Sequence, residues 1–218
     1  MESRLVEGAW GDPTIASFSG RYPDIDPWVS PDGQSIYFSS IRPVGPSEAR
    51  TDAEIFRVDR VGEGWGEPEH LEILGSDSDE LGASVAADGT IWFASDRVGG
   101  AGGWDLYTAR PTGDGFAAPE PVQAVNTPIW EINPAIATDG SSLIFTSIAR
   151  EGGSGLGDLF IVTRDGDAWS AARPLQINTS ADEYHPSVSP DGRTLYFVRR
   201  TAQGDLHEVD LAGVDSGG

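Results

Sequence analysis

The sequence has no Cys, and none of its 14 basic residues is Lys. Without Cys the chain forms no disulfide, no thiolate nucleophile and no thiolate metal site, and without Lys it forms no Schiff base. The absence of Cys does not indicate a compartment, because exported and cytosolic proteins both tolerate it. Several classes of enzyme are therefore excluded before any motif is considered.

Positive charge is scarce, because 35 acidic residues stand against 14 basic ones and the net charge is −21. Such a chain repels phosphate backbones and anionic membrane surfaces, so nucleic acid is not expected as a partner. No run approaches the ~18 apolar residues of a membrane-spanning helix, and we expect no membrane insertion. The first five residues lack the apolar core of a signal peptide, so either the protein stays inside the cell or an export signal has been removed.

Gly and Pro, in contrast, are abundant, with 28 and 15 residues, whereas hydrophobic residues make up 38% of the chain. This composition favours many short strands and turns over long helices. Seven Trp, eight Phe and five Tyr supply the large side chains that such a fold must bury.

One segment occurs four times, at intervals of 56, 51 and 52 residues (24 to 80, 80 to 131 and 131 to 183). The copies are DIDPWVSPDGQSIYFSS from Asp24, ELGASVAADGTIWFAS from Glu80, EINPAIATDGSSLIFTS from Glu131 and EYHPSVSPDGRTLYFVR from Glu183. Each has Asp-Gly near its middle. Asp bonds its own backbone two residues on and Gly accepts a positive φ, so each copy predicts two strands joined by a tight turn.

Two further strands follow in each repeat. A third strand opens on an acidic residue, in EIFRV from Glu54, DLYTA from Asp105, DLFIV from Asp158 and DLHEV from Asp205. A fourth begins at an aromatic residue with Pro or Ala three positions later, at Trp10, Trp65, Phe116 and Trp169. Four antiparallel strands repeated at this period form the blade of a β-propeller.

We therefore predict a single all-β domain over residues 1–218, with blades at about 19–72, 73–123, 124–176 and 177–211. Residues 5–18 resemble a fourth strand and would complete the last blade, closing the ring without an unpaired edge. Four closed blades in a monomer is the direct interpretation. Two alternatives stay open: two chains forming one eight-bladed ring, and a part of a larger propeller.

Several of these motifs, SPDGQSIYFSS, SPDGRTLYFVRR and SDRVGGAGGWDLY, resemble the PD40, or WD40-like, repeats of TolB-type propellers. With FSGRYPDIDPWVSPDG, they also resemble a group of bacterial PD40-domain proteins that are often exported, which implies a periplasmic or extracellular location. Those relatives usually carry a further N-terminal repeat, and residues 3–10 look like the end of one. The resemblance implies a fold and not an activity, because similar repeats occur in docking propellers, polysaccharide lyases and peptidase gating domains.

The first strand of each blade should line the central channel. Its leading residue is acidic in all four copies, whereas the residue two positions later differs in each: Asp24 and Asp26, Glu80 and Gly82, Glu131 and Asn133, Glu183 and His185. One hypothesis is a catalytic site with His185 as base or metal ligand beside Asp26 and Glu183, and with Asn133 binding the ligand. The alternative, which a single His among carboxylates favours, is that these groups bond backbone amides between the blades.

The acidic ring also suggests a cation, although the fold requires no cofactor. If Asp24, Glu80 and Glu131 converge, they form an oxygen cage suited to Ca²⁺, and converging carboxylates repel one another unless a cation lies among them. Arg42 and Arg97 follow the second strand in two copies. They are candidates for ligand binding, or they pair with these carboxylates.

Trp28 and Trp130 are the best candidates for stacking on a ligand, because both fall near the channel mouth and neither is repeated. Our first interpretation is a non-catalytic binding module that presents a rigid acidic face to a protein or glycan partner. The alternative is a carbohydrate-active lyase or hydrolase with its site at the channel mouth. A deep pocket around His185 would favour the enzyme, and a shallow mouth with exposed aromatic residues the binding module.

Overall fold

In a computed structural model, the protein is described over residues 1–3, 5–44, 51–113, 115–166, 168–202 and 204–214. Its regular structure is almost entirely antiparallel strand, with one 3₁₀-helix, η1 (Glu72–Leu74), and one short helix, α1 (Leu211–Val214). Within the described residues, no helix is long and apolar enough to cross a membrane. The predicted all-β class is confirmed.

Most of the strands belong to four sheets, which we call blades 1 to 4. Blade 1 contains β3 (Asp24–Val29), β4 (Ser35–Ser40), β5 (Glu54–Val61), β6 (Gly64–Trp65) and β7 (Glu69–His70). Blade 2 contains β8 (Glu80–Val85), β9 (Ile91–Ser95), β10 (Asp105–Ala109) and β13 (Glu120–Pro121). After β10 the chain forms a separate two-stranded hairpin of β11 (Pro111–Thr112) and β12 (Gly115–Phe116). Blade 3 contains β14 (Trp130–Ile136), β15 (Ser142–Ile148), β16 (Gly157–Asp165), β17 (Ala168–Trp169) and β18 (Arg173–Pro174). Blade 4 contains β19 (Asp182–Val188), β20 (Thr194–Arg200) and β21 (Asp205–Asp210).

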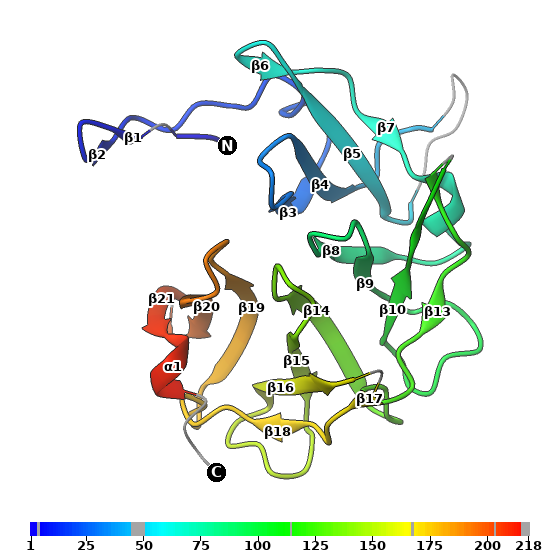
Figure 1. The fold of residues 1–218 in the computed structure, drawn as a ribbon, viewed down its shortest axis with the longest axis vertical. Helices are drawn as coiled ribbons and strands as arrows, with labels where there is room; N and C mark the ends of the chain where they lie inside the picture. The colour runs from blue at the N-terminus through cyan, green and yellow to red at the C-terminus, as the bar shows by residue number, and fades with distance from the viewer. Residues whose placement is uncertain (4, 45–50, 114, 167, 203, 215–218) are drawn as a thin grey trace.

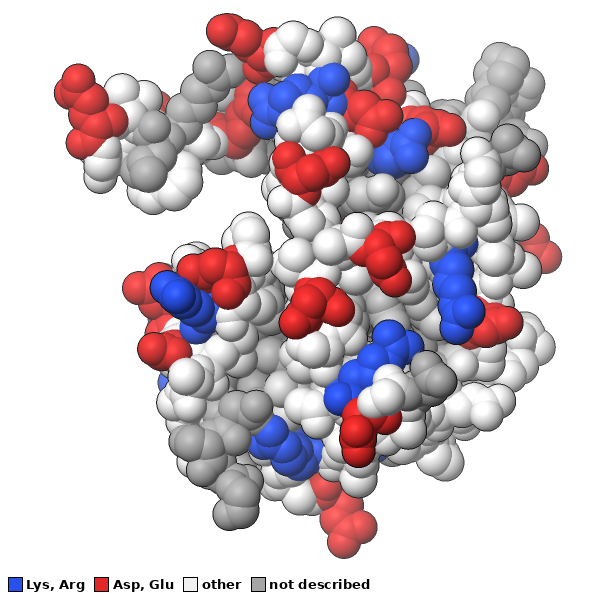
Figure 2. Space-filling model, in the orientation of Figure 1, with Lys and Arg blue, Asp and Glu red and all other residues white. Residues whose placement is uncertain are grey.

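The first strands of the blades, β3, β8, β14 and β19, gather around a common centre, and the later strands lie outward (Figure 1). The predicted propeller arrangement of four blades is therefore confirmed. The blades do not close the circle, however. An opening separates blade 4 from blade 1, and Figure 2 shows it as a notch between blade 4 and the N-terminal segment.

The N-terminal segment folds on itself and does not complete blade 4. β1 (Leu5–Val6) pairs with β2 (Ala9–Trp10), and Glu2 and Thr14 exchange two backbone hydrogen bonds of 2.8 Å. Blade 1 shows the same pattern around Trp65. There β5 pairs with β6, and Arg57, eight residues before Trp65, pairs with Glu69, four residues after it. Glu2 and Thr14 stand at the same distances from Trp10. Among the described residues, β1 and β2 pair with each other and β21 pairs with β20, so the predicted pairing of residues 5–18 with blade 4 is not seen in this structure.

The core lies between adjacent blades, because successive residues of the second strands point to opposite faces of their sheets. In β9, Ile91 and Phe93 pack toward blade 1, and Trp92 packs toward blade 3. The four repeated Phe residues, 38, 93, 145 and 197, are each at most 1% exposed. Burial of such a side chain contributes roughly 1.5–3 kcal/mol, so the contacts between blades hold the curved row of sheets together.

The Asp-Gly pairs form the predicted turns. In blade 3, the carboxylate of Asp139 accepts a 2.9 Å hydrogen bond from the backbone N–H of Ser141, and Gly140 has a φ of 72°. The same side-chain bond occurs at Asp32, Asp88 and Asp191. Each turn therefore sets the register of the two innermost strands, which carry the channel-lining residues.

Candidate functional site

Each innermost strand carries a β-bulge at the same place. The register against the second strand shifts between Ile25 and Trp28 in β3, and at the equivalent residues of β8, β14 and β19. The first bulged residue has a positive φ in every blade: 50° at Asp26, 64° at Gly82, 50° at Asn133 and 50° at His185. Bulges of this kind re-aim a side chain, and non-Gly residues in this conformation cluster at functional sites.

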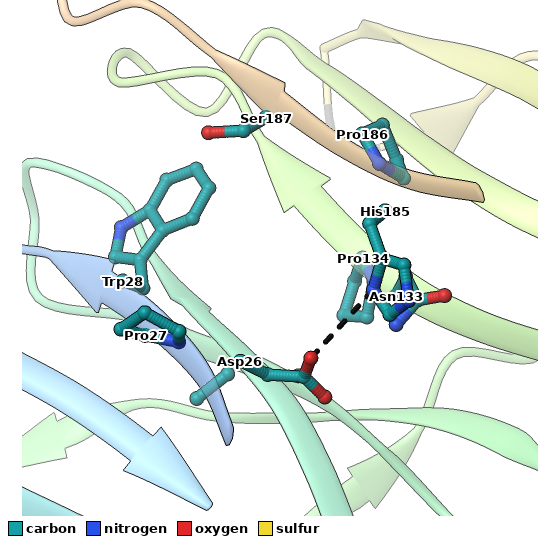
Figure 3. A pocket seen from close by; sticks show the side chains of 10 residues that line it. Asp26, Pro27, Trp28, Asn133, Pro134, His185, Pro186 and Ser187 are labelled. Carbon is teal, nitrogen blue, oxygen red and sulfur yellow. Dashed lines mark ion pairs between the residues drawn. The ribbon is translucent and has the colours of Figure 1, made fainter. Parts of the chain in front are cut away.

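These bulged residues form the channel ring, which we define as Asp26, Gly82, Asn133 and His185. The Nδ1 atom of His185 lies 3.6 Å from Oδ1 of Asp26, so one side chain of blade 1 and one of blade 4 come together at the channel (Figure 3). Burial raises the pKa of Asp26, and the nearby His185 opposes this effect by lowering it. The His185 side chain remains 54% exposed, so the pair stays accessible to a ligand in the channel.

The other two members of the ring shape the space. Asn133 lies beside His185 (Figure 3), and its Oδ1 atom is buried without a hydrogen-bond partner within the described part of the chain. A Cβ atom on Gly82 would lie 3.6 Å from Nδ2 of Asn133, so the glycine leaves that side of the ring without a side chain. The ring thus offers a carboxylate, an imidazole and an amide.

Two cavities meet at the channel ring. The smaller, of about 280 Å³, lies on the side of Pro27, Trp28 and Ser187. The larger, of about 670 Å³, is lined mainly by apolar and aromatic side chains, and we call it the aromatic bowl: Ile25, Leu81, Trp104, Trp130, Ile132, Tyr184 and Val198. Its polar lining residues are Asp26, Asn133, His185 and Arg200. Trp130 is 49% exposed there. A mainly apolar cavity with a few convergent polar groups is the usual form of a small-ligand site.

The acidic ring of the sequence lies elsewhere, buried within the blades. Each carboxylate is held by an Arg at the end of the second strand of its own blade: Asp24 by Arg42 at 2.6 Å, Glu80 by Arg97 at 3.0 Å, Glu131 by Arg150 at 3.3 Å and Glu183 by Arg199 at 2.7 Å. Each also accepts a hydrogen bond from a Ser or Thr hydroxyl. The four Arg side chains in turn donate to carbonyls of Phe18, Leu74, Val125 and Ile177.

This placement corrects the expectation that the acidic ring surrounds the channel mouth. Asp24, Glu80 and Glu131 do not converge, and among the described residues no group of three His, Asp or Glu side chains is placed to hold a metal ion. Burial raises the pKa of Glu80 and of Glu131, against the lowering effect of their hydrogen bonds and Arg partners. Glu183 likewise pairs with Arg199 and does not line either cavity. Whether the protein binds Ca²⁺ stays a prediction.

The structure thus brings together five of the predicted site residues, Asp26, Trp28, Trp130, Asn133 and His185, around two cavities that share three of them. Arg42 and Arg97 belong to the ion pairs instead. Sequence reasoning missed Trp104 and Tyr184 of the bowl. For the bulges, a signal was present in the sequence. Pro follows the ring member in three blades, at Pro27, Pro134 and Pro186, whereas Ala83 follows it in blade 2, and a repeated Pro in an inner strand indicates a bulge.

Comparisons with known proteins show the fold. No family model and no curated protein matches the chain. Among solved structures, TolB from Acinetobacter baumannii is 21% identical with a TM-score of 0.53, covering 86% of this chain and 41% of its own. An alpha-L-arabinofuranosidase from Lactobacillus brevis is 17% identical with a TM-score of 0.52, covering 91% of this chain and 64% of its own. Hydrazine synthase from Kuenenia stuttgartiensis is 13% identical with a TM-score of 0.57, covering 87% of this chain and 31% of its own.

The chain therefore has a propeller fold similar to that of TolB, and it spans less than two thirds of each of these structures. Because these neighbours include both TolB and enzymes, the fold does not distinguish binding from catalysis.

Proposed function

We propose that this protein is a non-catalytic binding module of the PD40 type and that its ligand is a glycan held in the aromatic bowl. The observation that carries the proposal is the composition of the bowl: the aromatic residues Trp104, Trp130 and Tyr184 line it together with the polar residues Asp26, Asn133, His185 and Arg200. Flat aromatic rings stack on the apolar faces of sugar rings. Carboxylate, amide, imidazole and guanidinium groups in the same lining exchange hydrogen bonds with sugar hydroxyls.

The charge of the protein narrows the ligand class. At a net charge of −21, acidic glycans are repelled, and we expect a neutral or amino-bearing one. Figure 2 shows acidic and Arg side chains interspersed over the face drawn, without one large patch of either sign. The predicted rigid acidic face is therefore replaced in this proposal by the bowl, whose contacts are aromatic and polar.

Calorimetric titration with a panel of neutral oligosaccharides tests the proposal. Trp130→Ala should weaken binding by about tenfold, because an aromatic contact is worth roughly 0.5–1.5 kcal/mol beyond its buried area. Trp10→Ala is the matched control, since Trp10 is 72% exposed in the N-terminal segment and does not line the bowl. If no glycan binds, or if both variants behave alike, the bowl is not a glycan site. Binding of a peptide there instead would indicate protein docking.

The ion pair of Asp26 with His185 favours a second candidate, a hydrolase or lyase acting on a glycan. A carboxyl group whose pKa is raised by burial and an accessible imidazole are the usual pair for general acid and base catalysis. In that case, Asp26→Asn should abolish turnover of chromogenic glycosides while leaving glycan affinity within about threefold, since the substitution keeps the shape of the site. Wild-type protein that binds a glycan without turnover supports the binding module.

A further inference from the structure

The outermost strand of blade 4, β21, lacks the partner that its counterparts have. In blades 1, 2 and 3 the third strand pairs with a two-residue fourth strand at one register: Phe56 with His70, Tyr107 with Pro121 and Phe160 with Pro174. His207 occupies the corresponding place in β21. Within the described residues, β21 pairs only with β20. In the part of the chain that the structure describes, its outer backbone edge therefore has no partner strand and is able to accept one.

Apolar side chains of blade 4 are exposed at positions that the other blades bury. Leu206 is 76% exposed, whereas its counterparts Ile55, Leu106 and Leu159 are at most 1% exposed. Tyr196 is 37% exposed, whereas Tyr37, Trp92 and Ile144 are at most 7% exposed. This face of blade 4 thus keeps the side chains of a contact between blades without having the contact.

The backbone of Leu106 and that of Leu159 show what a fourth strand supplies here. In blade 3, the side-chain amide of Asn178 accepts from the N–H of Leu159 and donates to its carbonyl, at 3.0 and 2.9 Å. Asn126 makes the same two bonds with Leu106 in blade 2. Leu206 stands at this position in blade 4, so an incoming segment with a suitably placed Asn would satisfy the same two groups.

Charge decides what kind of segment fits. Asp205, Glu208 and Asp210 of β21 are exposed. In blade 3, Arg173 lies across from Ile161, the counterpart of Glu208, so a fourth strand with a basic residue at this place would face the Glu208 carboxylate. Two β21 strands from two copies of the chain would instead place acidic residues opposite one another, which is destabilising.

We propose that β21 binds an extended segment of a cationic partner polypeptide by strand addition. The segment carries a basic residue opposite Glu208, an apolar residue two positions later on the side of Leu206, and an Asn that bonds the Leu206 backbone. Main-chain hydrogen bonds to β21 hold the segment, and its basic and apolar residues determine which sequences bind. This site is separate from the aromatic bowl and does not depend on the proposed glycan.

A peptide with the sequence of residues 171–178, AARPLQIN, is the natural probe, because it is the segment that blade 3 uses at this position. Fluorescence anisotropy with the full chain should show saturable binding. Leu206→Asp should weaken it by about tenfold or more, through loss of a buried leucine contact. Leu206 is 76% exposed and Glu208, substituted below, is also exposed, so the fold should tolerate both changes.

Exchange of charge provides the control. The Glu208→Arg variant should bind the peptide AARPLQIN about fivefold more weakly than the wild type does. It should prefer the peptide AAEPLQIN, in which Glu replaces the Arg. Absence of binding to the wild-type chain would overturn the proposal, as would affinity that neither Leu206→Asp nor Glu208→Arg changes.

Two other occupants are distinguished by separate measurements. A dimer in light scattering that Leu206→Asp converts to a monomer would identify a second copy of the chain. A spontaneous intramolecular disulfide between Thr14→Cys and Glu208→Cys would identify the N-terminal segment of the same chain, and the natural chain has no Cys to confuse the result. Either result would overturn the proposal of a cationic partner.

Discussion

At the scale of single residues, two sets of polar groups sit two positions apart along the same strands and have different roles. The leading carboxylates, such as Glu80, are fully buried and bonded to Arg and hydroxyl groups of their own blade. The bulged residues, such as Asp26 and His185, face the channel. The first set is required by every repeat, and only the second is free to differ.

Removal of one partner from a buried ion pair should destabilise the fold strongly. Arg97→Ala leaves the Glu80 carboxylate buried without its cation, and we expect the free energy of unfolding to fall by about 3–5 kcal/mol. Arg57→Ala is the control, because Arg57 pairs with the exposed Glu69 and such pairs contribute about 0–1 kcal/mol. Urea denaturation of both variants measures the difference, and equal losses would contradict the structural role of the Arg97–Glu80 pair.

The raised pKa of Asp26 gives stability a pH dependence of known sign. A carboxyl group whose pKa is higher in the folded state than its ordinary value of 3.8 stabilises the fold below that value. This contribution is lost as the pH rises through the folded pKa. Relative to the wild type, Asp26→Asn should therefore gain unfolding free energy as the pH increases from 3 to 7, measured by urea denaturation at several pH values. A difference that is constant with pH would show that Asp26 titrates normally.

At the scale of elements, the Asp-Gly turns and the bulges act together. The turn sets the register of the two inner strands, and the bulge then rotates one residue of the inner strand into the channel. Both devices depend on positive φ, which Gly adopts readily and which Asp, Asn and His adopt more readily than other side chains. The inner strands therefore tolerate only a few residue types at these positions.

Substitution of a turn glycine tests the importance of its backbone conformation. Gly140 has a φ of 72° and open space around a Cβ atom, so Gly140→Ala should destabilise by about 1–2 kcal/mol through backbone strain alone. Gly113 also has open space and does not have a positive φ. Gly113→Ala should change stability by less than about 0.5 kcal/mol in the same thermal unfolding experiment. A Gly140→Ala variant as stable as Gly113→Ala would show that the turn relaxes.

Sequence patterns predicted the individual strands and turns better than they predicted the site. The hairpins follow from Asp-Gly and from period-two alternation, both of which are local. The bulges were not predicted, although Pro27, Pro134 and Pro186 mark three of them. A bulge changes the face of the sheet on which a side chain lies. The sequence pattern alone therefore places Asp24, Glu80, Glu131 and Glu183 at the channel, whereas the residues two positions later line it.

At the scale of the whole molecule, the four blades form a curved row with two unlike ends. One end is blade 1 with the N-terminal segment, and the other is blade 4 with its exposed Leu206. Contacts between adjacent blades are the main source of stability in repeat proteins. Among the described residues, the apolar contacts of blade 4 with other blades are mainly with blade 3.

A pair of equivalent leucines measures this asymmetry. Leu159→Ala removes a fully buried side chain between blades 3 and 4 and should cost about 2–5 kcal/mol of unfolding free energy. Leu206→Ala, at the same position of the next repeat, should cost less than about 0.5 kcal/mol, because the side chain is 76% exposed. Comparable losses in urea denaturation would mean that the face of blade 4 is covered in solution.

The repeat, the strand order within a blade and the turns could be predicted from the sequence, because these features depend on neighbours a few residues apart. The folded protein was needed to show that Asp26 meets His185, that Trp104, Trp130 and Tyr184 share one cavity, and that residues 2–14 pair with one another. Those outcomes depend on the curvature of the row of blades. That curvature arises from side-chain packing between blades about fifty residues apart, which no local pattern specifies.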